Sequence, residues 1–334
     1  MHSKINMQSL LEIKDLVTVF DTNRGRIRAV DDVSLTLQAG ETLGIVGESG
    51  CGKTMLALSI MRLIPSNGRT IEGSVLFEGQ DLLKLSSEEI RARRGNEIAM
   101  IFQEPMTSLN PVIRIGEQIA EAIRLHQKLS AKEAINLSIQ QLREVGIADA
   151  EKRARDYPHQ MSGGMRQRVM IAMAMSCHPR LLLADEPTTA LDVTIQAQIL
   201  ALISDLKKKN NMAVILITHD LGVVAQTTEN VAVMYAGKIV EKARVDKIFD
   251  NPLHPYTRGL IDSLPDGCRE VGNNKYLKTI PGSVPSLYNL GAGCRFQDRC
   301  SRADGRCAVQ EPKLIEIRTG HFVSCWNAAP NSGN

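Results

Sequence analysis

Apolar residues along the chain gather in short continuous runs, and longer segments with helical spacing separate these runs. Four of the runs predict buried strands: Leu43–Val46, Ile98–Phe102, Leu181–Ala184 and Met212–Thr218. Strands that are buried on both faces and alternate with helices are typical of a mostly parallel sheet covered by helices. The pattern therefore predicts an α/β fold.

The pattern changes outside these runs. Residues 10–37 alternate apolar and polar positions, which predicts short strands with a turn between them in an antiparallel layer, and residues 73–78 are another strand candidate. Isoleucine recurs every four residues from Ile115 to Ile123, and Gly146 ends a second helical repeat, so a helical insertion is expected. After residue 251 the composition shifts toward Pro, Gly and Cys. We predict a first domain over residues 1–251, with a helical subdomain at 104–178, and an extension over residues 252–334.

Composition and charge exclude little. The 334 residues are 43% hydrophobic, with a net charge of +3, which is an ordinary globular composition. This mild basicity does not by itself indicate nucleic-acid binding. The first residues lack a long apolar segment, and no run of 18 apolar residues occurs, so we expect neither a signal peptide nor a spanning helix. Any membrane association is expected to be peripheral.

The run Leu43–Val46 leads directly into a glycine-rich segment that a helix-compatible run follows. This segment matches G-x-x-x-x-G-K-[ST] at every fixed position with Gly47, Glu48, Ser49, Gly50, Cys51, Gly52, Lys53 and Thr54. Glycines let several backbone N–H groups point at one anion, and the N-terminus of the helix adds positive potential. Lys53 can reach the outer phosphates and Thr54 suits a Mg²⁺ ligand. Cys51 is most simply a tolerated small residue. The alternative is a glycine-rich turn that binds nothing.

Polar residues end three other predicted strands. In parallel sheets ligands bind beyond the carboxyl ends of the strands, which is where Gln103, Asp185, Glu186 and His219 fall. Asp185 can hold Mg²⁺ and Glu186 can accept a proton from an attacking water. Gln103 suits positioning a water or a metal. Helix capping is the alternative for the Asp–Glu pair, and a structural histidine is the alternative for His219.

A second helix N-terminus with a serine cap begins at Ser162, Gly163 and Gly164. One nucleotide has only one γ-phosphate. A second anion site therefore suggests either a structural cap or a site completed by another subunit, and the spacing does not choose between them.

Together these motifs resemble the ATP-binding subunit of an ABC transporter. The loop resembles the Walker A motif, Gln103 the Q-loop and Met161–Met165 the LSGGQ signature, with Met replacing Leu and Gln. Residues 181–186 resemble Walker B with its catalytic glutamate, residues 189–192 the D-loop, and His219 the switch histidine. Phe20 lies where the family usually has the aromatic residue that stacks on adenine. The resemblance implies a P-loop NTPase core with an antiparallel β subdomain, a helical subdomain and a small Cys-containing extension.

Residues 254–257 (HPYT), the pair Leu264 and Pro265, and residues 102–111 resemble the peptide/nickel importer ATPases in particular. This resemblance implies ATP hydrolysis, with Mg²⁺ held by Thr54, Gln103 and Asp185, at sites shared by two head-to-tail subunits. Ser162, Gly163 and Gly164 of one subunit would close over the γ-phosphate bound to the other. The substrates implied are peptides, nickel or glutathione-like compounds.

The implied partners are a second and often non-identical ATPase subunit, two membrane permease subunits and an extracytoplasmic binding protein. The implied location is the cytoplasmic face of the bacterial inner membrane. The alternative is a soluble ABC ATPase that acts on nucleic acid or ribosomes, but such proteins usually have two cassettes or a long coiled-coil insertion. A non-hydrolytic regulatory module is disfavoured because Glu186 and His219 are both present. We therefore expect no nucleic-acid partner.

Four of the seven cysteines, Cys294, Cys300, Cys307 and Cys325, fall within the last 41 residues. An odd total and no export signal argue against a disulfide framework. Four thiols suit a metal site, although the paired C-x₂-C spacing of zinc ribbons is absent. Some peptide-importer ATPases have a [4Fe–4S] cluster in this region, which this sequence resembles. Zinc or reduced structural thiols are the alternatives.

Overall fold

A computed structural model describes residues 9–103, 108–189, 191–264 and 279–328. Residue contacts divide the chain into two compact units. The first unit comprises residues 1–10, 37–41 and 77–217, and the second comprises residues 11–36, 42–76 and 218–334. None of the described helices is long and apolar enough to cross a membrane.

The first unit contains three parallel strands. Strand β7 (Leu181–Asp185) pairs with β6 (Ile98–Ile101) on one side and with β8 (Ala213–Thr218) on the other. Every residue of β7 and β8 is buried, as the unbroken apolar runs predict. The α/β fold class is confirmed.

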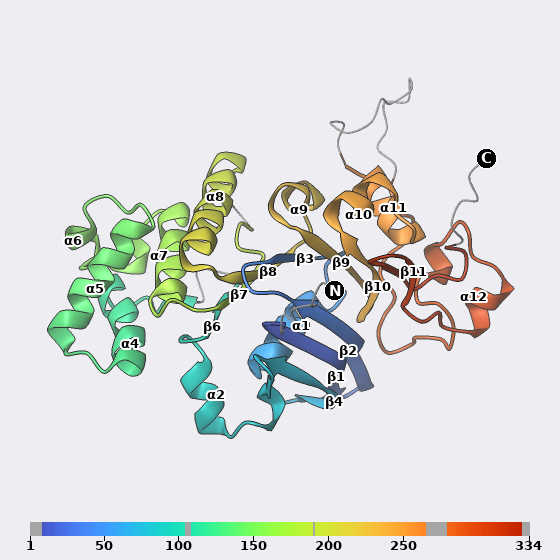
Figure 1. Ribbon diagram of the computed structural model, residues 1–334, viewed down its shortest axis with the longest axis horizontal. Helices are drawn as coiled ribbons and strands as arrows, with labels where there is room; N and C mark the ends of the chain where they lie inside the picture. The colour runs from blue at the N-terminus through green and yellow to red at the C-terminus, as the bar shows by residue number, and fades with distance from the viewer. Residues whose placement is uncertain (1–8, 104–107, 190, 265–278, 329–334) are drawn as a thin grey trace, which may run out of the picture. The chain divides into compact units, whose positions relative to one another are not determined.

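Most helices of the first unit form one group (Figure 1). The group comprises α4 (Ile115–Gln127), α5 (Ala131–Glu144), α6 (Ala150–Arg153) and α7 (Gly163–Met175), and α8 (Val193–Asn210) follows β7. Ile115, Ile119 and Ile123 are fully buried, so the predicted apolar stripe of α4 forms its packed face. Shorter elements complete the unit: β5 (Gln80–Asp81), η1 (Leu82–Lys84), α2 (Ser87–Arg93) and η2 (Pro158–Gln160).

The second unit begins with the layer predicted from alternating positions. Strands β1 (Leu11–Thr22) and β2 (Gly25–Leu37) are neighbours joined by a two-residue turn, the connection of an antiparallel hairpin, and β4 (Gly68–Phe77) lies on the other side of β1. The prediction of short strands was wrong, because β1 and β2 have 12 and 13 residues. Each strand continues through one residue with a positive φ, Asp15 in β1 (47°) and Asp32 in β2 (56°).

The second unit also contains a mixed sheet. Strand β3 (Thr42–Val46) pairs in parallel with β9 (Asn230–Tyr235), which forms an antiparallel hairpin with β10 (Lys238–Arg244). The chain end adds β12 (His321–Val323) to β10, and β11 (Ile315–Arg318) pairs with β12. The extension therefore continues the sheet of the residues before 251. The domain boundary at 251 stays a prediction.

Helices α1 (Lys53–Met61), α9 (Leu221–Thr227), α10 (Val245–Asp250), α11 (Pro255–Asp262) and α12 (Gly305–Val309), with the short turn η3 (Gln297–Arg299), complete the second unit. Three aromatic rings form the centre of its core. The ring of Tyr235 lies 4.6 Å from that of Tyr256 and 5.2 Å from that of Phe296, measured between centroids. These rings join the extension to β9 through buried apolar surface.

Candidate functional site

The glycine-rich loop has the predicted strand, turn and helix around it: β3 ends at Val46 and α1 begins at Lys53. Gly52, which precedes α1, has a φ of 109°, a conformation that other residues rarely adopt. A Cβ at Gly52 would also lie only 2.3 Å from the carbonyl oxygen of Ala29. Both conformation and space therefore require glycine at this turn.

The start of α1 is suited to an anion. No side chain caps this helix, and its first turn contains no acidic residue. Neither a cap nor a carboxylate of that turn therefore competes with an anion for the positive N-terminus. Lys53 is 5% exposed, and its Nζ donates to the carbonyl oxygens of Gly47 (2.8 Å) and Glu48 (3.1 Å). Burial raises the pKa of the neighbouring Cys51 thiol, which keeps this side chain neutral. The loop thus combines a lysine with a helix N-terminus.

In the other unit the structure brings Gln103 and Glu186 together. The amide of Gln103 donates to Glu186 Oε2 at 3.0 Å, and the Thr189 hydroxyl donates to the same oxygen at 2.8 Å. Asp185, the last residue of β7, is 1% exposed. Glu186 follows with a φ of 45°, the left-handed region in which a glutamate is strained. A residue with a strained backbone and a hydrogen-bonded carboxylate, directly after a buried strand, is characteristic of a functional position.

His219 belongs to the same unit as the phosphate loop. It directly follows β8, and its side chain is exposed. The next residue, Asp220, caps α9 by accepting hydrogen bonds from the N–H groups of Gly222 and Val223. The strand and the cap fix the backbone on both sides of His219.

The predicted second anion site has the expected local form. Ser162 caps α7, and its hydroxyl accepts a hydrogen bond from the Met165 N–H at 3.4 Å. Ser162 and Gly163 are exposed, and the first turn of α7 contains no acidic residue. Ser162 is therefore a structural cap of α7, and the N-terminus of α7 also remains accessible to an anion. Ala190 of the predicted D-loop lies outside the described residues, as do Glu104–Thr107 of the segment after Gln103.

Phe20 lies in β1 and is only 8% exposed. Its ring packs against Gly68, where an added Cβ would meet ring atoms within 2.7 Å. The adenine-stacking role of Phe20 stays a prediction.

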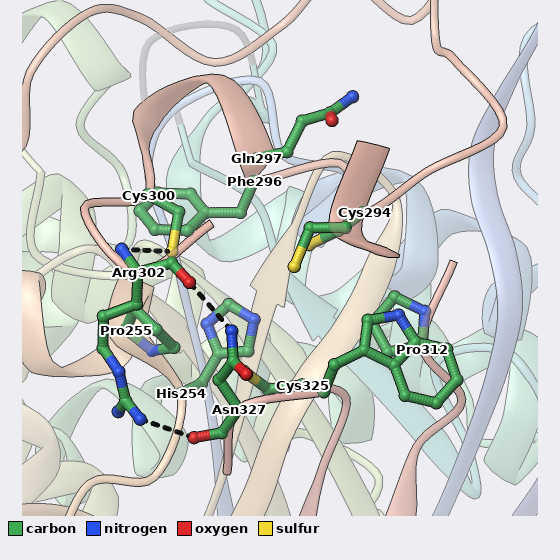
Figure 2. A pocket seen from close by; sticks show the side chains of 12 residues that line it. His254, Pro255, Cys294, Phe296, Gln297, Cys300, Arg302, Pro312, Cys325 and Asn327 are labelled. Atoms are coloured by element: carbon green, nitrogen blue, oxygen red, sulfur yellow. Dashed lines mark hydrogen bonds between the residues drawn. The ribbon is translucent and has the colours of Figure 1, made fainter. Parts of the chain in front are cut away.

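The four C-terminal cysteines line one pocket, together with His254 and Phe296 (Figure 2). Their thiols are free, and burial raises the pKa of Cys294 to about 11 and also raises that of Cys300 and Cys325. The number and type of these side chains fit a thiolate site. Yet among the described residues no group of three or more His, Cys, Asp or Glu side chains is arranged to hold a metal ion. Cys268 lies outside the described residues.

Sequence reasoning missed two residues that contact the loop. Tyr256 and Arg299 both bind Glu48, and hydrogen bonding to Glu48 raises the pKa of the Arg299 guanidinium. The HPYT segment contains Tyr256, but nothing in its sequence indicates a contact more than 200 residues away.

The loop, the helix N-terminus behind it and the parallel strands define a phosphate-loop nucleotide-binding protein. The profile of the ABC transporter family matches residues 30–189, and that of the oligopeptide/dipeptide transporter C-terminal region matches residues 240–307. A probable peptide ABC transporter ATP-binding protein of Sinorhizobium fredii is 54% identical over 98% of each chain. The oligopeptide transport ATP-binding protein OppD of Haemophilus influenzae is 49% identical over 97% of this chain and 98% of its own. The chain therefore belongs to the ABC transporter ATP-binding proteins of the oligopeptide/dipeptide group.

Solved structures agree with this assignment. The ATP-binding cassette MJ0796, in a dimeric post-hydrolysis state bound to ADP and Pi, is 26% identical with a TM-score of 0.64. The match covers 70% of this chain and 98% of that chain. A cbiO1 structure from Clostridium perfringens, at 23% identity and a TM-score of 0.61, shows the same fold.

Proposed function

We propose that this chain hydrolyses ATP to power the import of peptides through a membrane permease. The observation that carries the proposal is the hydrogen-bonded pair of Gln103, two residues after β6, and Glu186, directly after β7, in a chain that also has a complete phosphate loop. The peptide and oligopeptide transport ATP-binding proteins named above support the substrate class.

In this proposal Lys53 and the N–H groups of the loop bind the phosphates of ATP. Thr54, Gln103 and Asp185 would hold Mg²⁺, and a bound Mg²⁺ would neutralise negative charge on the phosphates. Glu186 accepts the proton of the attacking water, and Gln103 orients that carboxylate. His219 acts as the switch histidine, and Phe20 packs beside the adenine.

We further propose that each ATP lies between two cassettes. The exposed N-terminus of α7 at Ser162, Gly163 and Gly164 would contact the γ-phosphate bound to the partner subunit. The dimeric state of MJ0796 supports this arrangement. The partner is a second ATPase subunit, proposed to be a non-identical homologue.

Two permease subunits and an extracytoplasmic binding protein complete the proposed importer, with this chain peripheral on the cytoplasmic face of the inner membrane. Nickel and glutathione-like compounds are the other substrate classes implied by the resemblance. Copurification followed by reconstitution in proteoliposomes tests the proposal. We expect the binding protein loaded with peptide to stimulate ATP hydrolysis. Recovery of ribosomes or nucleic acid with no permease would support the soluble alternative instead.

The four cysteines around one pocket support a proposed iron–sulfur cluster held by Cys294, Cys300, Cys307 and Cys325. The proposal requires the thiols to rearrange, because no group of three or more such side chains in the described part of the chain is arranged to hold a metal ion. Anaerobic purification should yield iron, acid-labile sulfide and an absorbance band at about 400 nm. Stoichiometric zinc without iron, or no metal at all, would reject it.

A further inference from the structure

Glu48, the second residue of the phosphate loop, is bound by the C-terminal extension at two points. Its carboxylate accepts two hydrogen bonds from the Arg299 guanidinium, at 2.6 and 3.0 Å, and its backbone N–H donates to the Tyr256 hydroxyl at 2.8 Å. The Glu48 carbonyl in turn accepts from Lys53 Nζ at 3.1 Å. One residue of the loop thus connects the extension with the phosphate-binding lysine.

The extension holds both partners of Glu48 in fixed positions. The Arg299 side chain is 5% exposed and also donates to the carbonyl oxygen of Pro281 at 2.7 Å. Tyr256 is fully buried, and its ring packs against Tyr235 and Phe296. An arginine fixed in this way loses little side-chain entropy when it binds a carboxylate with both nitrogens.

The ion pair of Arg299 and Glu48 changes the charge of the phosphate loop. The proposed phosphate-binding loop contains the carboxylate of Glu48, whose side chain is 32% exposed. An unpaired negative charge here would repel the phosphates of a nucleotide, whereas a bidentate arginine neutralises it. A neutral hydrogen-bonding partner would leave the charge of Glu48 in place, whereas Arg299 neutralises it.

We propose that the C-terminal extension positions the phosphate loop for nucleotide binding, with Arg299 neutralising Glu48 and Tyr256 fixing its backbone. Arg299 and Tyr256 are positioning residues, since they act through Glu48. This inference rests on the proposed nucleotide site. It also gives the HPYT segment of the extension a role in that site.

The test measures binding of Mg²⁺ and AMP-PNP, the β,γ-imido analogue of ATP, to the full-length chain by titration calorimetry. We expect Arg299→Gln to weaken binding about tenfold or more, because it leaves the Glu48 carboxylate unneutralised. Glu48→Gln should change affinity by less than about threefold. The double variant should bind more tightly than Arg299→Gln alone, because it removes the repelling charge. Tyr256→Phe should weaken binding, with no recovery from Glu48→Gln.

Two control variants separate positioning from general stability. Arg258→Gln removes an exposed arginine of α11 that donates to the carbonyl oxygen of Pro252. His321→Ala removes the side chain that contacts Glu241 in the core at 2.7 Å. His321→Ala should lower the melting temperature, and both controls should keep wild-type affinity. A double variant that binds no better than Arg299→Gln would overturn the inference. Failure of the wild-type chain to bind AMP-PNP would instead overturn the proposed function.

Discussion

At the scale of single residues, Glu186 has the least ordinary backbone in the site. Its left-handed φ of 45° costs about 1–2 kcal/mol for a side chain with a Cβ. Its backbone N–H donates to the Ile217 carbonyl oxygen of β8 at 2.9 Å, and its carboxylate binds Gln103 and Thr189. These contacts hold the carboxylate in one orientation, which a general base requires.

Replacing Glu186 with Gln should therefore separate binding from chemistry. We expect AMP-PNP affinity within about threefold of wild type and a turnover about 10²–10⁴-fold lower, because the amide cannot accept the proton of water. Steady-state phosphate release and titration calorimetry measure the two quantities. Glu121→Gln, an exposed change on α4, is the control and should leave both unchanged. Wild-type turnover in Glu186→Gln would reject the assignment of the base.

At the scale of elements, the connection from β3 to α1 depends on glycines of different importance. Gly50 has a φ of 79° but open space where a Cβ would be, whereas Gly52 has both a positive φ and a backbone oxygen in that space. The two positions allow strain and steric overlap to be distinguished.

We expect Gly50→Ala to lower the free energy of unfolding by about 1 kcal/mol, the cost of the unfavourable φ alone. Gly52→Ala should cost about 3 kcal/mol or more, because β2 must also move away from the new methyl group. Urea denaturation followed by circular dichroism measures both. Equal losses in the two variants would show that the contact with Ala29 is relieved at no cost.

Helix α11 also depends on one residue, its cap. His254 Nδ1 accepts a hydrogen bond from the Tyr256 N–H, and burial lowers the pKa of His254 to about 4, although Glu241 opposes this shift. The imidazole is therefore neutral in the folded protein at pH values where it is charged in the unfolded chain. The folded state binds fewer protons in this range, so stability falls as the pH falls.

Stability should fall as the pH falls from 6.5 to about 4. The total loss of unfolding free energy due to His254 across this window amounts to about 3 kcal/mol. His254→Asn keeps a side-chain acceptor for the cap but does not titrate. In this window the unfolding free energy of the variant should change less with pH than that of wild type. The difference in slope should correspond to about one bound proton. Urea denaturation at about pH 7.5 and about pH 5 makes the comparison. Parallel curves for the two proteins would contradict a neutral, buried His254.

At the scale of the whole molecule, the proposed site is complete only with a second cassette. Ser162 and Gly163 are exposed at the N-terminus of α7, and in the proposal they act on a nucleotide bound elsewhere. A chain of this kind is expected to bind ATP alone and to hydrolyse it efficiently only in a dimer.

We therefore expect the specific ATPase activity of the purified chain to rise with protein concentration or on addition of its partner ATPase subunit. Ser162→Arg should abolish this rise while AMP-PNP affinity of the monomer stays within about threefold, since the substitution leaves the phosphate loop intact. Phosphate release across a dilution series makes the measurement. A specific activity independent of both concentration and partner would contradict the shared site.

The sequence by itself determined the features that depend on neighbouring residues. The apolar runs became β6, β7 and β8, and the motif of Gly47–Thr54 became a turn that leads into α1. Strand burial, helical periodicity and the need for glycine act over a few positions, so their patterns are readable in order along the chain. The lengths of β1 and β2 were not readable, because polar residues do not interrupt a strand with one exposed face.

Only the tertiary structure decided which distant residues meet. Gln103 and Glu186 are 83 residues apart, and Glu48 and Arg299 are 251 residues apart. Neither pairing leaves a local pattern, because it depends on how buried strands and aromatic rings bring the segments together. The structure likewise placed the four C-terminal cysteines around one pocket with His254 and added β12 to β10. Folding thus connected the phosphate loop, recognisable from its sequence alone, to a C-terminal extension that gave no local sign of the contact.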